Sequence, residues 1–425
     1  MPLTTVSASR ISAASAYSFA VDNSDVVVLP GVTVASTGAA GLSATGSSSD
    51  FTVFGAVSGA TFGIRLGDAA TDAGNTLRLG DLATVFGATT GVAFTGRSGL
   101  IDNRGDIYAQ GTGILLNVGA TGTVTARNYG LVTADTAVDA SASTGTVRFV
   151  NSGTLQGETA AYLGGGGADL FTNRGTLEGD ILLGAGNDVF TQSNFFYGID
   201  ANGGLVDGGA GNDRFAMATA SPGPNPATYA GGAGTDTLDL SRGTFVVADL
   251  ALPNFTSIEV VIGGSNADAL SGDDLANTLI GGEGSDTLSG RGGADLLVIE
   301  DGDRAQGGAG SDTFRFAEPG ANAFPAFDTP RILDWSSVSG NDDRIQVSAA
   351  GFGGGLVAGA AITAAQFQSS TSPIAAGAAV RFIWDRDNRG LYFDADGSGT
   401  ASQAVIVATF DGTAPVTAAD ILVIA

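Results

Sequence analysis

The chain has 425 residues, 67 of which are Gly, and its formal net charge is −25. It contains no His, no Cys and no Lys, since all 18 basic residues are Arg. This alphabet excludes a Ser-His-Asp triad, a thiol nucleophile, a disulfide framework, a structural zinc site and a His-based metalloprotease. A strongly acidic chain also repels phosphates, so we expect no nucleic-acid partner. Hydrophobic residues make up 43% of the chain, which is enough to form a core.

The acidic residues are distributed unevenly. Of the 43 acids, 37 are Asp, and 27 of these Asp lie in residues 161–425. Asp beside Gly is typical of tight turns, in which the side chain bonds back to the backbone. We therefore expect the C-terminal part to contain many acidic turns.

Residues 1–49 are rich in Ser, Thr, Ala and Gly and predict an irregular N-terminal cap or the first strands of the solenoid. Residues 1–30 lack both the basic segment and the apolar run of a secretory signal peptide. No apolar stretch approaches 18 residues, so we expect no transmembrane segment.

Residues 50–190 contain a long repeat, and we assign 50–163 to a parallel β-helix. An N-x-G-x-hydrophobic motif begins at Asn103, Asn128, Asn151 and Asn173, with spacings of 25, 23 and 22 residues. A unit of this length with two or three short strands is typical of one coil of a parallel β-helix. Two copies of TVFGA, beginning at Thr52 and Thr84, indicate two earlier units.

The repeat predicts which residues face the core of this β-helix. Its inward column should contain Ile107, Val132, Leu155 and Leu177. The coils resemble those of bacterial adhesins and autotransporter passengers.

Residues 164–315 carry a nine-residue pattern, G-G-x-G-x-D-x-U-x, in which U is a large apolar residue. Four copies run in tandem at 263–298, and a fifth at 307–315 follows the eight-residue interruption IEDGDRAQ. Four more begin at 164, 183, 208 and 231. Each copy predicts a six-residue turn and a three-residue strand whose middle residue is buried. These inward residues are Phe171, Phe190, Phe215, Leu238, Leu270, Leu279, Leu288, Leu297 and Phe314.

The turns carry the chemistry of a cation site. Gly permits positive φ and leaves backbone carbonyls free, while Asp supplies a carboxylate. Two copies form one coil of a right-handed parallel β-roll, so stacked turns offer about six oxygens to one hard cation, which suits Ca²⁺. The predicted metal-site residues are Gly164, Gly166, Asp169, Gly186, Asp188, Gly209, Gly211, Asp213, Gly232, Gly234, Asp236, Gly263, Gly264, Asp268, Asn277, Gly281, Gly282, Gly284, Asp286, Gly293, Asp295, Gly307, Gly308, Gly310 and Asp312.

The tandem run also predicts which turns stack. Asp268 and Asp286 should lie on one edge, and Asn277, Asp295 and, after a slip of one residue, Asp312 on the other. Asn277 lacks the negative charge, so we expect a weaker site there. Asn266 replaces the fourth-position Gly and should adopt the left-handed conformation.

The repeats resemble the RTX calcium-binding repeats of bacterial proteins exported by type I secretion. Residues 316–425 are similar to the segment that follows such repeats in serralysin-like proteins. RILDWSSVSGNDDRIQV at 331–347 resembles a strand-turn-strand cap, and 381–399 predict a hairpin. The DADGSG turn at 394–399 begins like an EF-hand loop but has Val405 at position 12, so we interpret it as a capping turn.

The resemblance also implies a route out of the cell. The final residues, Asp420 to Ala425, resemble an uncleaved C-terminal export signal, although an ordinary terminal strand has the same pattern. The implied partner is a type I secretion apparatus, and the implied location is extracellular or on the cell surface.

Together these features predict an all-β chain, in which a right-handed parallel β-helix continues into a calcium-binding β-roll with a C-terminal β cap. The expected domains are 1–49, 50–163, 164–315 and 316–425. We interpret the protein as a structural surface-layer, matrix or adhesin-type protein that folds on Ca²⁺, with cell-surface polysaccharide or its own copies as partners. The alternative is a calcium-dependent polysaccharide lyase or epimerase-like enzyme, for which Arg104, Arg127 and Arg148 near the coil corners are candidates. No residue is predicted to be catalytic, and no upstream apolar helical region suggests a pore-forming toxin.

Overall fold

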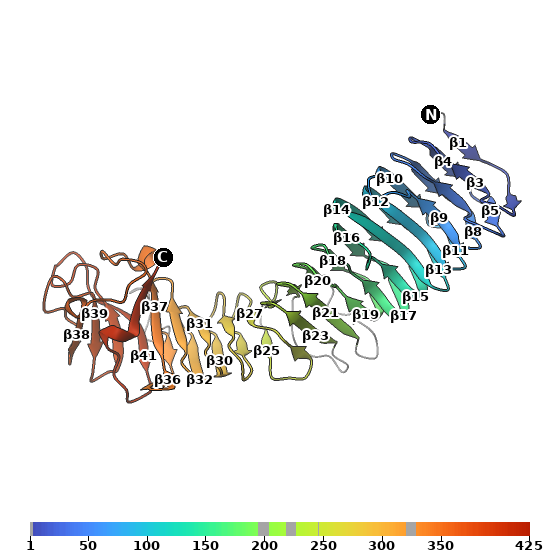
Figure 1. Cartoon of the computed structure of the whole chain (residues 1–425). Helices are drawn as coiled ribbons and strands as arrows, with labels where there is room; N and C mark the ends of the chain where they lie inside the picture. The colour runs from blue at the N-terminus through green and yellow to red at the C-terminus, as the bar shows by residue number, and fades with distance from the viewer. Residues whose placement is uncertain (1–2, 194–203, 218–226, 245, 320–328) are drawn as a thin grey trace. The chain divides into compact units, whose positions relative to one another are not determined.

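The computed structural model describes residues 3–193, 204–217, 227–244, 246–319 and 329–425. These residues form two compact units, one comprising Met1–Ala216 with Pro222–Asp236 and the other Met217–Ser221 with Thr237–Ala425. Each unit is a parallel β-solenoid in which strands of successive coils lie side by side (Figure 1). The boundary between the units falls inside the predicted 164–315 region.

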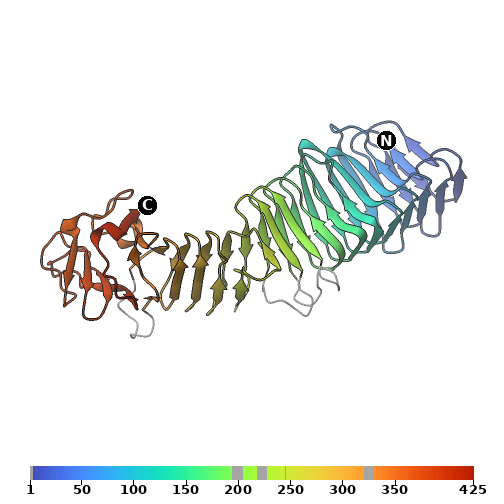
Figure 2. The same cartoon turned by 60° about the horizontal axis from the view of Figure 1, so that its bottom comes forward.

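Unit 1 has three parallel ladders, which Figure 2 shows as stacked strands. The first ladder contains β1 (Thr4–Val6), β4 (Asp25–Val28), β7 (Asp50–Val53), β10 (Ala73–Leu79), β12 (Thr90–Asn103), β14 (Thr112–Asn128), β16 (Thr146–Asn151), β18 (Leu170–Asn173), β20 (Val189–Gln192) and β22 (Arg214–Ala216). The second contains β2 (Arg10–Ser12), β5 (Thr33–Ser36), β8 (Ala56–Gly59), β11 (Thr84–Gly87), β13 (Asp106–Ala109), β15 (Leu131–Asp139), β17 (Thr154–Leu163) and β19 (Thr176–Leu182). The third begins with β3 (Tyr17–Phe19), β6 (Leu42–Ala44) and β9 (Phe62–Leu66). It continues through parts of the long strands β12, β14, β15, β17 and β19, and ends with β21 (Leu205–Ala210) and β23 (Thr228–Ala233).

The core of unit 1 consists of columns of identical or similar apolar side chains. The predicted column is confirmed, because Ile107, Val132, Leu155 and Leu177 pair in register and are all fully buried. A second column stacks Phe171 on Phe190, with ring centroids 5.7 Å apart. Parallel pairing without a register slip places like residues above one another, so one inward position per strand is enough to build a continuous core.

A row of buried amides holds one corner of the β-helix. Asn103 donates to Asn128, Asn128 to Asn151, and Asn151 to Asn173, at 2.7 to 2.9 Å. The row ends where Asn173 donates to Gln192 Oε1 at 3.0 Å. An amide both donates and accepts, so each member satisfies the next without any added group.

Two expectations for the N-terminal part are corrected. Residues 3–49 form the first strands of the solenoid, the second of the two expected alternatives, and not an irregular cap, since β1 to β6 pair in parallel with the strands of later coils. The two TVFGA copies are not equivalent, because Thr52 pairs with Arg78 whereas Thr84 pairs with Ala56. Alternation of small and apolar residues fits either register, so the composition of residues 1–49 did not reveal the first coils. The identity of the two TVFGA segments arose by chance and suggested an equivalence that the structure does not have.

Unit 2 has two facing ladders of short strands. One contains β24 (Thr237–Asp239), β27 (Val260–Ile262), β29 (Thr278–Ile280), β31 (Leu296–Ile299), β33 (Thr313–Phe316), β37 (Arg344–Ser348) and β42 (Ile421–Ile424). The other contains β25 (Val247–Asp249), β28 (Ala269–Ser271), β30 (Thr287–Gly292), β32 (Arg304–Ala309), β34 (Arg331–Ile332), β41 (Val405–Phe410), β40 (Gly390–Phe393), β39 (Phe382–Asp385) and β38 (Phe367–Ser370). The remaining elements are β26 (Phe255–Thr256), β35 (Ser337–Val338), β36 (Asn341–Asp342), α1 (Ala349–Phe352), and the 3₁₀ turns η1 (Ala364–Gln366) and η2 (Ala418–Asp420).

The burial predicted for the nonapeptide strands is confirmed in both units. All nine predicted inward residues, from Phe171 to Phe314, are at most 1% exposed. The interruption 299–306 is itself part of a coil, because Arg304 at its end pairs with Thr287. A block one residue short thus keeps the solenoid in register.

The C-terminal segment closes the ladders of unit 2 as predicted. β34 and β37 extend the two ladders with a short antiparallel pair, β35 and β36, between them. The predicted hairpin is the antiparallel pair β39 and β40. The terminal strand β42 pairs with β37, and its Ile421 and Val423 are buried. Within the described residues, no helix is long and apolar enough to cross a membrane.

Candidate metal centre

The nonapeptide turns share one backbone conformation. The second and fourth glycines of the turn have positive φ, between 94° and 145°, at Gly184, Gly186, Gly209, Gly211, Gly232, Gly234, Gly282, Gly284, Gly308 and Gly310. Gly164, Gly166, Gly263 and Gly264 do not have positive φ. Asn266 does not have positive φ either, so the expectation of a left-handed conformation there is wrong. Arg291 instead has φ 74° at a second position, where its guanidinium pairs with Asp249 at 2.7 Å.

The sixth positions of the turns stack into three rows of buried side chains, none more than 4% exposed. Row A lies in unit 1, and rows B and C lie on the two edges of unit 2. Row A contains Asp169, Asp188, Asp213 and Asp236; row B contains Asp268, Asp286 and Asp303; row C contains Asn277, Asp295, Asp312 and Asp343.

Each row is linked by one repeated hydrogen bond. The backbone N–H of each member donates to Oδ1 of the next member, at 2.6 to 3.1 Å. The structure therefore brings together the residues that the spacing assigned to each edge. Sequence reasoning missed Asp303 and Asp343, which lie 17 and 31 residues beyond the preceding members. Asp303 could have been found from the sequence, because it lies in the eight-residue interruption IEDGDRAQ at 299–306.

The second carboxylate oxygen has no donor in the middle of each row. Oδ2 is buried without a hydrogen-bond partner at Asp188, Asp213, Asp286, Asp295 and Asp312. An ionised carboxylate oxygen in this state costs several kcal/mol unless a cation or a proton compensates it. The rows thus contain positions that need a positively charged ligand.

The first glycine of the turn leaves a space beside this oxygen. A Cβ at Gly290 would collide with Asp295 Oδ2 and lie 2.5 Å from the carbonyl oxygen of Gly307. A Cβ at Gly208 would likewise meet Asp213 Oδ2 and lie 2.7 Å from Gly231 O. Gly281 and Gly307 face Asp286 and Asp312 in the same way, whereas the turn of Asp188 has Leu183 at this position. Gly208, Gly231 and Gly290 were not among the predicted site residues, which emphasised the positive-φ glycines instead.

This arrangement fits a hard cation that binds oxygen. Within the described residues, no three acidic side chains converge on one point. Each space instead combines one carboxylate oxygen with backbone carbonyls of adjacent coils, as at Asp295 and Gly307. Carboxylate and carbonyl oxygens in a flexible arrangement are the ligands of Ca²⁺, which these residues would hold between successive turns.

Burial raises the pKa of several carboxyl groups in the rows. It raises the pKa of Asp188 and Asp295 to about 7 and that of Asp286 to about 6. The hydrogen bond from the neighbouring backbone opposes the rise, and other carboxylates add to it, as Asp312 does for Asp295. In the absence of a cation, these groups therefore retain protons at a pH where an exposed Asp has lost its proton.

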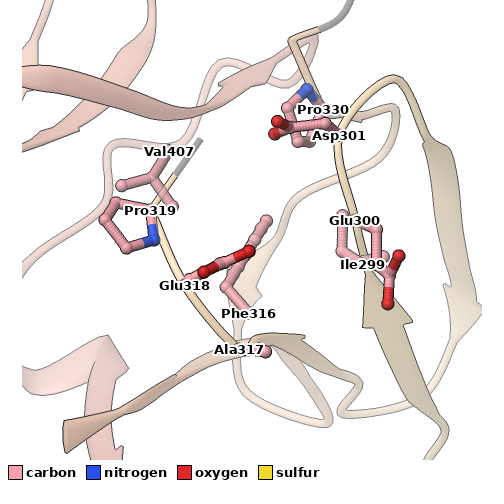
Figure 3. Close-up of a pocket in the computed structure, with 9 residues that line it drawn as sticks. All are labelled: Ile299, Glu300, Asp301, Phe316, Ala317, Glu318, Pro319, Pro330 and Val407. Carbon is pink, nitrogen blue, oxygen red and sulfur yellow. The ribbon is translucent and has the colours of Figure 1, made fainter. Parts of the chain in front are cut away.

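The DADGSG turn and one cavity contain further acidic residues outside the three rows. In the DADGSG turn, Asp394 Oδ1 accepts from the Asp396 N–H at 3.2 Å and Asp396 Oδ2 from the Ala401 N–H at 2.9 Å, as in a capping turn. A cavity of about 290 Å³ in unit 2 has Glu300, Asp301 and Glu318 around an otherwise apolar lining (Figure 3). Repulsion from neighbouring carboxylates adds to burial in raising the pKa of Glu300.

Comparison with known proteins identifies the repeats. Residues 260–298 match the family model of the RTX calcium-binding nonapeptide repeat, with four copies. A search of curated proteins finds no significant match. Among solved structures, the chain is similar to a subunit of the mannuronan C5-epimerase of Azotobacter vinelandii, with 30% identity, coverage of 38% of this chain and 80% of that one, and a TM-score of 0.25. The tandem run is thus confirmed as RTX repeats, a family that binds Ca²⁺, while the predicted copies at 164–239 and 307–315 lie outside the matched residues.

We expect Gly290→Ala to remove one bound calcium. Gly290 does not have positive φ, so Ala can adopt its conformation, but the methyl group would fill the space between Asp295 Oδ2 and Gly307 O. The calcium-induced rise in Tm should fall by about 2–4 °C, equivalent to about 1 kcal/mol for a domain of this size. The measurement compares Tm in calcium and in chelator, so that a general packing defect cancels. Gly377→Ala is the matched control, because a methyl group there has no atom within 4 Å; an undiminished calcium response in Gly290→Ala would contradict the site.

We expect stability in chelator to decrease with rising pH. The pKa of Asp295 is about 7 in the folded protein and about 4 in the unfolded chain, so the folded state binds more protons between these values. Stability therefore falls as pH rises through this window and is lowest above about pH 7. Calcium replaces these protons, so its effect on Tm should grow between about pH 5 and about pH 8. Thermal unfolding across this range with and without calcium tests the sign, and a chelated protein that becomes more stable at higher pH would refute it.

Proposed function

Because the chain carries RTX calcium-binding repeats, we propose that it is a secreted structural protein whose solenoid folds on calcium outside the cell. The observation that carries this proposal is the set of buried carboxylate oxygens without a donor in rows A, B and C. A net charge of −25 adds general repulsion that opposes the compact state. Divalent cations between the turns relieve both costs.

The expected energy is large enough to switch folding. Extracellular calcium modules have affinities of about 10⁻⁴–10⁻³ M, so calcium at roughly millimolar concentration adds on the order of 1 kcal/mol per site. Several such sites together are comparable to the whole stability of a domain, about 5–15 kcal/mol. In a calcium-poor cytosol the repeats would stay loose enough for export.

The C-terminal strand supports this order of events. Ile421 and Val423 are buried against β37, and Asp420 accepts hydrogen bonds from the N–H and hydroxyl of Thr417 at 2.7 and 2.9 Å. An export signal in these residues would be accessible only before the cap folds. We therefore propose recognition of the C-terminal segment by a type I secretion apparatus first, and calcium-driven folding at the cell surface afterwards.

Circular dichroism during a calcium titration tests the proposal. We expect the purified chain in excess chelator to have a reduced β signal and a lower Tm, and calcium at roughly 1–10 mM to restore both. Magnesium at equal concentration is the control and should restore much less, because it demands tighter octahedral geometry. A full native β signal in chelator that calcium leaves unchanged would exclude calcium-driven folding.

A second candidate function is binding or cleavage of an acidic polysaccharide. Arg127 and Arg148 are exposed within β14 and β16, with Arg127 directly before the corner residue Asn128, and neither makes an ion pair with a described residue. Arg104 does lie at a corner, 5.1 Å above the ring of Tyr129. Unpaired guanidinium groups on adjacent strands suit the carboxylates of a uronate polymer.

Affinity electrophoresis in a polyuronate gel tests this second candidate. We expect the Arg127→Gln/Arg148→Gln double variant to lose retardation, whereas Arg386→Gln, which removes an exposed Arg of unit 2, should keep it. Absorbance of unsaturated products then distinguishes a lyase from a binding protein. Equal mobility with and without the polymer for the unaltered protein would exclude this role.

A further inference from the structure

The start of row A and both ends of rows B and C differ from the middles of the rows. At the start of row A, Asp169 Oδ2 accepts from the hydroxyl of buried Tyr162 at 3.0 Å. At the start of row B, Asp268 Oδ2 accepts from the Gly264 N–H at 2.5 Å. At the ends of rows B and C, Oδ2 of Asp303 and Asp343 accept from the backbone N–H groups of Glu300 and Ser336, both at 2.8 Å.

Row C begins with an amide that satisfies itself. Asn277 Oδ1 accepts from the Asp273 N–H at 2.8 Å, and Asn277 Nδ2 donates to the Ile258 carbonyl at 3.3 Å. The amide nitrogen Nδ2 thus donates a hydrogen bond at a place where a carboxylate oxygen could only accept one. A carboxylate at this position would instead place an oxygen opposite the Ile258 oxygen, which is unfavourable unless a cation lies between them.

We propose that the turns at the start of row A and at both ends of rows B and C are cation-independent and that calcium is confined to the other turns of the rows, which deepens the proposed calcium function and rests on it. Tyr162, Asn277 and the backbone donors occupy the role that calcium has at Asp213, Asp286, Asp295 and Asp312. These turns give rows B and C a coil with satisfied polar groups at both ends, and row A one at its start. The expected weak calcium site at Asn277 is thus replaced by a site that calcium does not occupy.

The turn of Asn277 retains the first glycine of a binding turn, although its second and fourth residues, Asp273 and Leu275, do not have positive φ. A Cβ at its first glycine, Gly272, would collide with Asn277 Oδ1 and lie 2.7 Å from the carbonyl oxygen of Gly290. Gly290 shows the same relation to Asp295 and Gly307 one coil further on. The side chain of Asn277 therefore keeps an oxygen beside the first glycine, and it differs from Asp295 in its charge and in Nδ2, which replaces the other carboxylate oxygen and donates to Ile258 O. Replacing this amide by a carboxylate should create a site.

Native mass spectrometry of the full chain with calcium tests the proposal. We expect Asn277→Asp to bind one calcium more than the unaltered protein. Asn266→Asp is the matched control, because it adds the same charge at an exposed position of an adjacent block and should leave the stoichiometry unchanged. Equal stoichiometry in Asn277→Asp and the unaltered protein would overturn this inference alone. No calcium bound by the unaltered protein would overturn the proposed function itself.

Tyr162→Phe provides a second readout if Asn277→Asp does not fold. Removing the hydroxyl leaves Asp169 Oδ2 without its donor while keeping the ring between Phe149 and Phe171. We expect a lower Tm in chelator and a larger calcium-induced rise in Tm than in the unaltered protein. A calcium-induced rise equal to that of the unaltered protein would contradict the role of Tyr162.

Discussion

One hydrogen bond organises the acidic part of the molecule: a backbone N–H in one coil donates to the Oδ1 atom of an Asp in the next. This bond fixes the register of adjacent turns and buries the carboxylate, as at Asp286 and Asp295. Burial in turn leaves Oδ2 facing a space that the first glycine of the turn keeps open. The same contact that aligns the coils therefore creates the demand for a cation.

The two kinds of polar row explain why calcium dependence is expected in one part of the chain and not in another. In the Asn row from Asn103 to Asn173 each amide donates to the next, because every amide carries both a donor and an acceptor, and only the first oxygen, Asn103 Oδ1, is left without a donor among the described residues. A carboxylate has only acceptors, so an Asp row cannot close without an external positive charge or a terminal donor such as the Tyr162 hydroxyl. Composition at one position per coil thus decides whether a solenoid segment is stable alone or only with calcium.

Much of the fold could be predicted because a solenoid repeats one local rule. The inward positions, the stacking of Asp268 on Asp286 and the C-terminal hairpin all follow from periodicity and alternation. Asp343 was hidden because it belongs to the cap and reaches row C through the fold, not through the repeat. Gly290 was missed because its role is to leave space beside Asp295, whereas the sequence pattern draws attention to glycines with positive φ. The individual strands within residues 4–44 were not assigned from the sequence, because small polar residues form these coils without a recognisable period.

The central claim is that calcium lies between the interior acidic turns, bound by the open carboxylate oxygen. Anomalous diffraction from crystals of the full chain grown in calcium tests it most directly. The account predicts anomalous peaks within bonding distance of Asp295 Oδ2 and Asp312 Oδ2, and none at the Asn277 amide. Crystals saturated with calcium that show no peak beside either carboxylate would contradict it.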